Sequence, residues 1–180
     1  MGSKLLTHLV GLAVVVAAFV AVSVTHAGKK ASSSKTMFVN GDLVDCHTVN
    51  ESRHDGDNQL NMVAIAGKFT GTLNGSYDGT ERNVVHKDGS ASFSGSGVFT
   101  GEVNGRSGTA VLTYAGTVDT KRAVIAHWVL DKGTDDLARL DGQGTFQGKE
   151  LRQALEGCKD SKSQTAFSGN YRGIVQFPGQ

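Results

Sequence analysis

The sequence contains little proline, little tryptophan and no excess of charge of either sign. It has one proline (Pro178) and one tryptophan (Trp128) in 180 residues, which excludes collagen-like repeats and proline-rich linkers. Lys and Arg total 18, and Asp and Glu total 17. Because phosphate binding requires an excess of basic side chains, we expect no nucleic-acid partner. Only 19% of the residues are charged and apolar runs are present, so global disorder is not expected.

Motifs that would indicate a metal or cofactor are also missing. No Cys-x-x-Cys, Gly-x-Ser-x-Gly, His-Glu-x-x-His or phosphate-binding glycine loop occurs. Asp131, Asp135, Asp136 and Asp141 form an acidic group, but their spacing does not match a calcium-binding loop. We therefore expect neither a metal nor a cofactor.

Residues 1–27 are typical of a secretory signal peptide. Lys4 precedes an uncharged, mainly apolar stretch, Leu9–Val24, and Thr25-His26-Ala27 places small residues where a signal peptidase cleaves. Cleavage after Ala27 would release a secreted or periplasmic protein with no membrane contact, led by a polar segment over residues 28–40.

An N-terminal membrane anchor is the alternative location. The apolar stretch spans 16 residues, somewhat short of the roughly 20 needed to cross a bilayer. Lys29, Lys30 and Lys35 follow it, and positive charge there resists export.

The mature chain has two cysteines, Cys46 and Cys158. In an oxidising compartment we expect them to pair. Such a bridge closes a long loop, worth about 4–5 kcal/mol in the chain-entropy model. Two buried free thiols are the alternative.

The body of the chain has the pattern of an antiparallel β protein. Short apolar stretches predict strands at Leu60–Thr70, Thr72–Tyr77, Arg82–His86, Ala91–Thr100, Thr109–Ala115, Ala123–Leu130, Gly144–Phe146 and Tyr171–Phe177. Turn dipeptides lie between or within them: Asn74-Gly75, Asp78-Gly79, Asp88-Gly89, Asn104-Gly105 and Asp141-Gly142. Both residues of such a pair tolerate positive φ, which favours hairpins.

Patterning within the strands favours a barrel over an open sheet. Phe99, Gly101 and Val103 alternate with polar residues, whereas Ala123–Leu130 is nearly all apolar, as expected of a strand buried on both faces. The pattern aromatic-x-Gly-x-apolar-x-Gly begins at Phe69, Phe99 and, with Tyr in the apolar position, Phe167. Glycines within strands mark points where a sheet coils sharply or closes.

One segment has a helical pattern. Leu151, Ala154 and Leu155 share a face within Lys149–Glu156, and Gly157 follows as a suitable C-terminal cap. The sequence therefore predicts an all-β protein. We expect one small closed antiparallel barrel of about eight strands over residues 41–180, with a short late helix in an insert at 149–158.

Four glycine-rich motifs carry a resemblance to a known family. They are Phe69-Thr-Gly71, Ser94-Gly-Ser-Gly-Val-Phe-Thr-Gly101, Gly105-Arg-Ser-Gly-Thr-Ala-Val-Leu112 with Gly116, and Gly133-Thr-Asp-Asp-Leu-Ala-Arg-Leu-Asp-Gly-Gln-Gly144. Together they resemble an uncharacterised bacterial family with an allene oxide cyclase-like, dirigent-like barrel. The resemblance implies a calycin-type fold and, by analogy with cyclase and dirigent barrels, a homo-oligomer.

Three polar sites are candidates for chemistry. His127 and Trp128 lie in the most apolar strand, so at least one must face inward, and Tyr114 lies on the strand expected to pair with it. An imidazole, an indole and a hydroxyl in an apolar wall are typical of a ligand pocket. His86, beside Arg82, could act as an acid or base, or it could simply belong to a polar strand edge. Arg106 could bind a carboxylate or phosphate, or it could be an exposed structural side chain.

These observations favour an exported barrel that binds a small apolar ligand around His127, Trp128 and Tyr114. Two alternatives remain: a cyclase- or isomerase-like enzyme acting on a hydrophobic substrate in the barrel, and an extracytoplasmic protein-interaction module. The sequence leaves open whether the protein is an enzyme. The state of the barrel interior, hollow or filled by side chains, separates the first two functions from the third.

Overall fold

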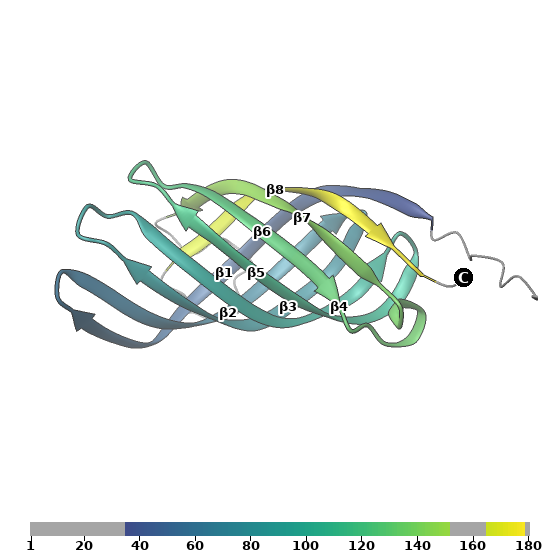
Figure 1. The fold of residues 1–180 in the computed structure, drawn as a ribbon, viewed down its shortest axis with the longest axis horizontal. Coiled ribbons are helices and arrows are strands. Elements are labelled where there is room, and N and C mark those ends of the chain that lie inside the picture. Colours follow the sequence, from purple (N-terminus) through teal and green to yellow (C-terminus); the bar gives the residue numbers. More distant parts are fainter. Residues whose placement is uncertain (1–34, 152–164, 179–180) are drawn as a thin grey trace, which may run out of the picture. The chain divides into compact units, whose positions relative to one another are not determined.

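The computed structural model describes residues 35–151 and 165–178, which form a closed antiparallel barrel (Figure 1). Its strands follow one another around the ring in chain order. Their bounds are β1 Thr36–Asp55, β2 Asn58–Gly71, β3 Leu73–Val85, β4 Ala91–Val103, β5 Arg106–Val118, β6 Ala123–Asp131, β7 Asp141–Leu151 and β8 Thr165–Gln176. The predicted all-β antiparallel barrel of eight strands is confirmed.

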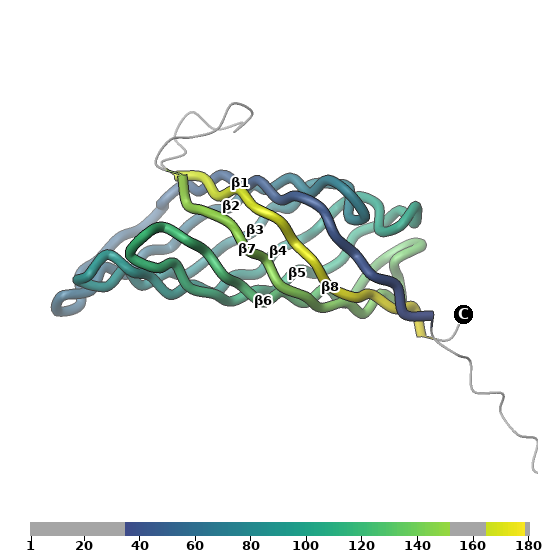
Figure 2. Tube along the Cα trace, turned by 90° about the horizontal axis from the view of Figure 1, so that it is seen from above, coloured from purple at the N-terminus to yellow at the C-terminus, as the bar shows by residue number. Residues whose placement is uncertain are grey.

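Pairing between the first and last strands closes the ring. Gly41 of β1 lies opposite Gly71 of β2 on one side and Tyr171 of β8 on the other. Figure 2 shows β1 and β8 running side by side along the seam. Closure leaves no unpaired sheet edge, which removes the main risk of edge-to-edge aggregation.

The strand count is right, but one strand was missed and another was predicted as two. β1 was missed, and the last five residues of the predicted polar lead, Thr36–Asn40, belong to it. The segments predicted as Thr72–Tyr77 and Arg82–His86 are one strand, β3. These two errors cancel in the total.

Among the described residues, glycine occurs within strands more often than in turns. Asp88-Gly89 and Asn104-Gly105 do form turns, and Asn104 and Gly105 both have positive φ, 52° and 78°. Asn74-Gly75 and Asp78-Gly79 instead lie inside β3, and Asp141-Gly142 begins β7. The turn between β1 and β2 contains Gly56 at φ 58°.

The prediction of a helix from Lys149 is wrong at its start. Lys149, Glu150 and Leu151 continue β7 and pair with Ser168, Phe167 and Ala166 of β8. The rest of the predicted helical insert, residues 152–158, lies outside the described residues. A short 3₁₀ helix, η1 Asp135–Leu137, occurs in the β6–β7 connection.

Aromatic rings and glycines share the barrel interior. Eight inward-facing aromatics are followed two residues later by a glycine on the same face: Phe69, Tyr77, Phe93, Phe99, Tyr114, Phe146, Phe167 and Tyr171. The Trp128 ring instead lies against glycines of other strands, Gly144 and Gly173. A Cβ at Gly144 would lie 2.6 Å from Trp128 Cε2. Glycine thus leaves the space that each ring occupies, which explains the repeated motif in the sequence.

β6 is buried on one face only. Val124, Ala126, Trp128 and Leu130 are buried, while the residues between them are exposed. The prediction of a strand buried on both faces is therefore wrong. The exposed positions are Ala123, Ile125, His127 and Val129, and three of these four residues are apolar. The alternation of inward and outward residues is therefore not visible in the sequence of this strand.

One end of the barrel is plugged by its own chain. Leu137 of η1 and Leu140 are 0% and 3% exposed, and Thr134 holds the connection by accepting a hydrogen bond from the Thr109 amide at 3.2 Å. The opposite end carries the β1–β2, β3–β4 and β5–β6 turns and the β7–β8 connection. We call it the hairpin end.

No helix in the described part of the chain is long and apolar enough to cross a membrane. The predicted signal peptide, residues 1–27, lies outside the described residues.

Candidate functional site

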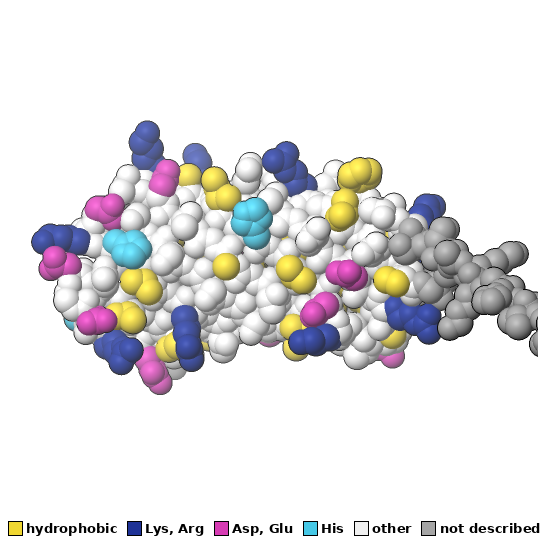
Figure 3. Space-filling model, in the orientation of Figure 1, with side chains coloured by type: hydrophobic (Ala, Val, Ile, Leu, Met, Phe, Trp, Pro, Cys, Tyr) yellow, Lys and Arg dark blue, Asp and Glu magenta, His cyan; other side chains and the backbone are white. Residues whose placement is uncertain are grey.

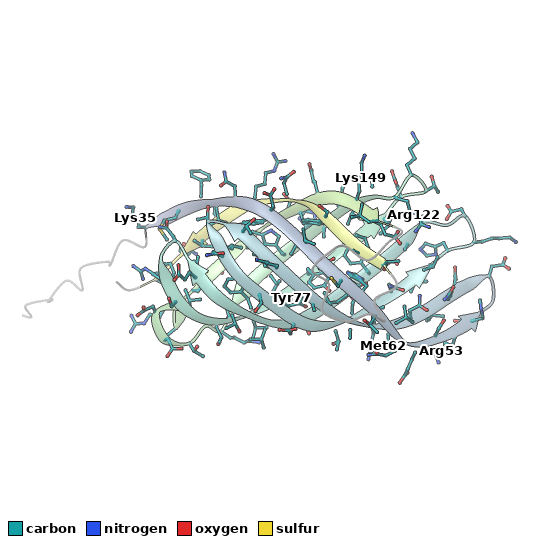
Figure 4. All side chains as sticks on the ribbon, turned by 180° about the vertical axis from the view of Figure 1, so that it is seen from behind. Lys35, Arg53, Met62, Tyr77, Arg122 and Lys149 are labelled. Carbon is teal, nitrogen blue, oxygen red and sulfur yellow. The ribbon has the colours of Figure 1, made fainter. Side chains whose placement is uncertain are left out.

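A small cavity lies inside the barrel. Its volume is about 50 Å³, whereas a cavity that admits benzene is about 150 Å³. The interior is thus largely filled, with room for a few non-hydrogen atoms. The lining is mainly apolar and aromatic: Leu43, Phe69, Tyr77, Phe93, Leu112, Tyr114, Val124, Ala126, Trp128, Phe146, Phe167 and Tyr171, with Asp45, His47 and Glu81. Figure 4 shows Tyr77 inside the barrel, between the two ends.

The polar lining residues come from β1, β3 and β5 and contact one another. His47 Nε2 lies 3.1 Å from Asp45 Oδ1, and His47 Nδ1 lies 3.9 Å from Glu81 Oε1. The Tyr114 hydroxyl donates to Glu81 Oε2 at 3.2 Å. We call Asp45, His47, Glu81 and Tyr114 the polar cluster. Side-chain exposure of His47 and Glu81 is 5% and 3%, so both are removed from bulk water.

A chain of amides connects the polar cluster to the surface. Asn83 Nδ2 donates to Glu81 Oε1 at 3.3 Å, and Asn61 Nδ2 donates to Asn83 Oδ1 at 2.8 Å. Gln59 continues the chain by donating to Asn61 and to Ser52. These contacts hold the carboxylate of Glu81 in place and lead toward the hairpin end.

The protonation of the cluster differs from that of free side chains. Burial by itself lowers the pKa of His47, but the hydrogen bond to Asp45 and the charges of Asp45, Glu81 and Glu150 outweigh it and raise that pKa. Burial raises the pKa of Glu81 more than His47, Asn83 and Tyr114 lower it. Both shifts mean that the folded cluster holds protons more tightly than the unfolded chain.

Two polar atoms in the cavity wall lack a hydrogen-bond partner among the described residues. They are the Tyr77 hydroxyl and Trp128 Nε1, in side chains that are 3% and 5% exposed. The Tyr77 hydroxyl lies near that of Tyr114 without adequate hydrogen-bond geometry. Burial raises the pKa of Tyr77 to about 12, so its hydroxyl stays neutral. Buried groups of this kind usually find a partner.

The structure brings together two of the three predicted site residues. Trp128 and Tyr114 lie directly opposite each other on β6 and β5 and both line the cavity. His127 does not belong to this site, because it faces outward and is exposed. The reason is the strict alternation of β6, which sends neighbouring side chains to opposite faces.

The other candidates also lie away from the cavity. His86 Nδ1 is 3.2 Å from Asn58 Oδ1 near the β3–β4 turn. The guanidinium of Arg106 stacks over the Phe177 ring at 4.1 Å, at the plugged end. In residues 35–151 and 165–178 no group of three His, Cys, Asp or Glu side chains is arranged to hold a metal ion.

Sequence reasoning missed Asp45, His47 and Glu81 because it missed β1 and broke β3. The signal was nonetheless present. Leu43, Asp45 and His47 alternate with Val44 and Cys46, so a strand through this segment places an acid and an imidazole on one face.

A second ion pair lies near the cluster at the hairpin end. Arg122, in the β5–β6 turn, binds Glu150 of β7 with Nη1 2.6 Å from Oε2. Figure 4 places Arg122 and Lys149 at the same end of the barrel.

The fold and site define a small β-barrel with an aromatic interior and a buried polar cluster. Residues 42–156 match the family described as "Protein of unknown function (DUF3224)". Because the match covers more than half of the sequence, the chain belongs to this family.

A solved structure from this family agrees with the fold. A DUF3224-family protein of unknown function from Shewanella oneidensis is 20% identical, with a TM-score of 0.55 over 76% of this chain and 96% of that one. A protein of unknown function from Clostridium acetobutylicum is 12% identical, with a TM-score of 0.44 over 78% and 97% of the two chains. The search of curated proteins found no match.

Proposed function

We propose that this protein binds a small molecule inside its barrel, with an apolar part against the aromatic lining and a polar group at the polar cluster. The observation that carries the proposal is the pair of unpartnered polar atoms, Tyr77 Oη and Trp128 Nε1, in the wall of the cavity. Leaving such a group unsatisfied costs about 1–3 kcal/mol, and a ligand, or a water held with it, restores the lost hydrogen bond.

The distribution of polarity supports this orientation. The acidic and basic side chains of the lining come from β1 and β3 (Asp45, His47 and Glu81), and the remaining lining is apolar or aromatic. A few convergent polar groups with shifted pKa values in an apolar pocket are typical of ligand sites. The cavity of about 50 Å³ limits the inserted part to a few atoms unless side chains move.

Titration of candidate ligands against the fluorescence of Trp128, the only tryptophan, tests the proposal. The indole lines the cavity, so ligand entry should change its emission. Ala126→Val adds two methyl carbons to the cavity wall and should weaken binding at least tenfold. Ala115→Val, on an exposed outward position of β5, is the matched control and should leave the affinity unchanged. Equal affinities of both variants would contradict an interior site.

Isomerase-like chemistry is the second candidate, and the polar cluster is the observation that favours it. An imidazole between two carboxylates can accept and return a proton at a bound ligand. The resemblance to allene oxide cyclase-like barrels supports it by analogy only. Deuterium incorporation from D₂O into a bound ligand, followed by NMR, tests it; a ligand that binds without exchange contradicts this second function.

We also propose that the mature protein is extracytoplasmic and contains a Cys46–Cys158 disulfide. Cys158 lies outside the described residues, but the topology supports the pairing. Cys46 lies opposite Ala166, which in turn lies opposite Leu151. The connection that contains Cys158 therefore leaves and rejoins the sheet within two strand spacings of Cys46, or about 10 Å.

A further inference from the structure

We propose that the ligand of this barrel is a small organic cation, a protonated amine on a short apolar body, with its ammonium group at Glu81. This inference rests on the proposed interior site and names the class of ligand.

The polar side of the cavity has more acidic than basic side chains. Two carboxylates line it, those of Asp45 and Glu81, and the charge of Glu150 also raises the pKa of His47. Arg122 pairs with Glu150, and His47 is the cation that faces the other two. In the described part of the chain, this cluster therefore has one more carboxylate than it has cationic side chains.

Glu81 is the carboxylate with the weaker cationic contact. His47 approaches Asp45 to 3.1 Å but Glu81 only to 3.9 Å, and the other contacts of Glu81 are neutral hydroxyl and amide groups of Tyr114 and Asn83. A buried carboxylate needs a full charge partner or a proton. An ammonium group supplies that charge and keeps Glu81 ionised.

The surroundings of Glu81 in the cavity are aromatic. Tyr114 donates to Glu81, and its ring lies 6.0 Å from that of Tyr77 and 6.1 Å from that of Phe93, centroid to centroid. All three rings line the cavity. Aromatic walls around a carboxylate attract cations through the ring quadrupoles, and they repel anions.

The Tyr77 hydroxyl is buried and neutral, and it lacks a partner of adequate hydrogen-bond geometry among the described residues. A primary ammonium has three N–H donors, enough to bind a Glu81 oxygen and the Tyr77 oxygen together. A carboxylate ligand would instead face Asp45 and Glu81 and be repelled.

Three probes of nearly equal size separate the charge types: n-propylamine, 1-propanol and propionate, each titrated at pH 7 with Trp128 emission and ligand-observed NMR as readouts. We expect the amine to bind at least tenfold more tightly than the alcohol, and propionate to bind most weakly. Glu81→Gln, which keeps the shape and removes the charge, should abolish the advantage of the amine. Glu102→Gln, at an exposed position of β4, is the matched control and should preserve it.

The outcomes distinguish this inference from the proposed function. If the alcohol or propionate binds as tightly as the amine, the cation inference is overturned and the interior site stands. If amine binding survives Glu81→Gln unchanged, the assignment of Glu81 is overturned. If no probe binds by either readout, both the interior site and the cation inference are contradicted.

Discussion

Two buried tyrosines provide a direct test of the hydrogen bonding inside the barrel. Tyr171 and Tyr77 are 1% and 3% exposed, so Tyr→Phe removes a hydroxyl oxygen of nearly equal burial at both positions. The Tyr171 hydroxyl accepts from the Leu73 amide at 2.8 Å and lies 3.1 Å from the Thr70 carbonyl oxygen. The Tyr77 hydroxyl has no partner among the described residues.

The two substitutions should therefore differ in their effect on the free energy of unfolding. Tyr171→Phe leaves the buried amide of Leu73 without an acceptor, which costs about 1–3 kcal/mol. Tyr77→Phe removes a buried polar group that makes no bond, so we expect no loss and a gain of a few tenths of a kcal/mol or more. For a domain of this size, 1 kcal/mol corresponds to roughly 2–4 °C in Tm.

Urea unfolding followed by Trp128 emission measures both variants, with equal m values as the check that the comparison is valid. A loss in Tyr77→Phe as large as that in Tyr171→Phe would refute the reasoning, because it would mean that the Tyr77 hydroxyl has a stabilising partner. If the proposed ligand site is correct, Tyr77→Phe should also weaken amine binding while leaving stability intact. If Tyr77 had a purely structural role, amine affinity would not fall in Tyr77→Phe without a loss of stability.

Two further predictions concern pH and export. The pKa values of Glu81 and His47 are raised on folding from 4.5 and 6.5, so each group binds its proton more tightly in the folded state, and the stability it contributes is lost as pH rises through its folded pKa. The stability of the wild type relative to Glu81→Gln should therefore fall as the pH rises from 4.5 through the folded pKa of Glu81 in urea titrations, and a constant or rising difference would contradict the cluster. For export, mass spectrometry of protein recovered from outside the cytoplasm should give an N-terminus near Gly28 and one linked peptide pair containing Cys46 and Cys158; an intact Met1 or two alkylated thiols in unreduced material would count against it.

The fold was predictable to the extent that strands alternate and turns carry glycine. Phe99, Gly101 and Val103 do share the inner face of β4, and β5 and β6 pair as expected. The division of β3 into two predicted strands has a physical cause. In a narrow barrel, glycine also serves the interior, and Gly79 of β3 is an example: a Cβ there would lie 2.7 Å from Tyr77 Cζ and 2.6 Å from the Ser96 carbonyl oxygen.

The outer surface explains why the sequence did not distinguish His127 from Trp128 as the inward-facing residue of β6. Exposed apolar residues such as Ile125 and Val129 are 54% and 40% exposed, so hydrophobicity did not distinguish the two faces of that strand. Figure 3 shows hydrophobic side chains on the outer face as scattered spots among polar ones. Alternation within a strand predicts which residues share a face, but it does not predict which face is inside.

The position of the polar cluster follows from how the barrel is filled. Toward the plugged end, Phe69, Phe99 and Tyr171 pack edge to face, with ring centroids 5.4–5.7 Å apart, and Leu137 and Leu140 close the space beyond them. Toward the hairpin end the inward positions of β1 and β3 change to Asp45, His47 and Glu81, which lie among the rings of Phe93, Tyr114 and Phe167. A barrel selected only for stability has little reason to bury an imidazole between two carboxylates, because well-packed apolar residues there are usually as stable or more so. Because the cluster is present despite its cost in stability, we infer that this end of the cavity serves recognition. The paired comparison of Glu81→Gln and Glu102→Gln tests this inference. A gain in stability together with a loss of amine binding in Glu81→Gln is the result expected of a binding residue.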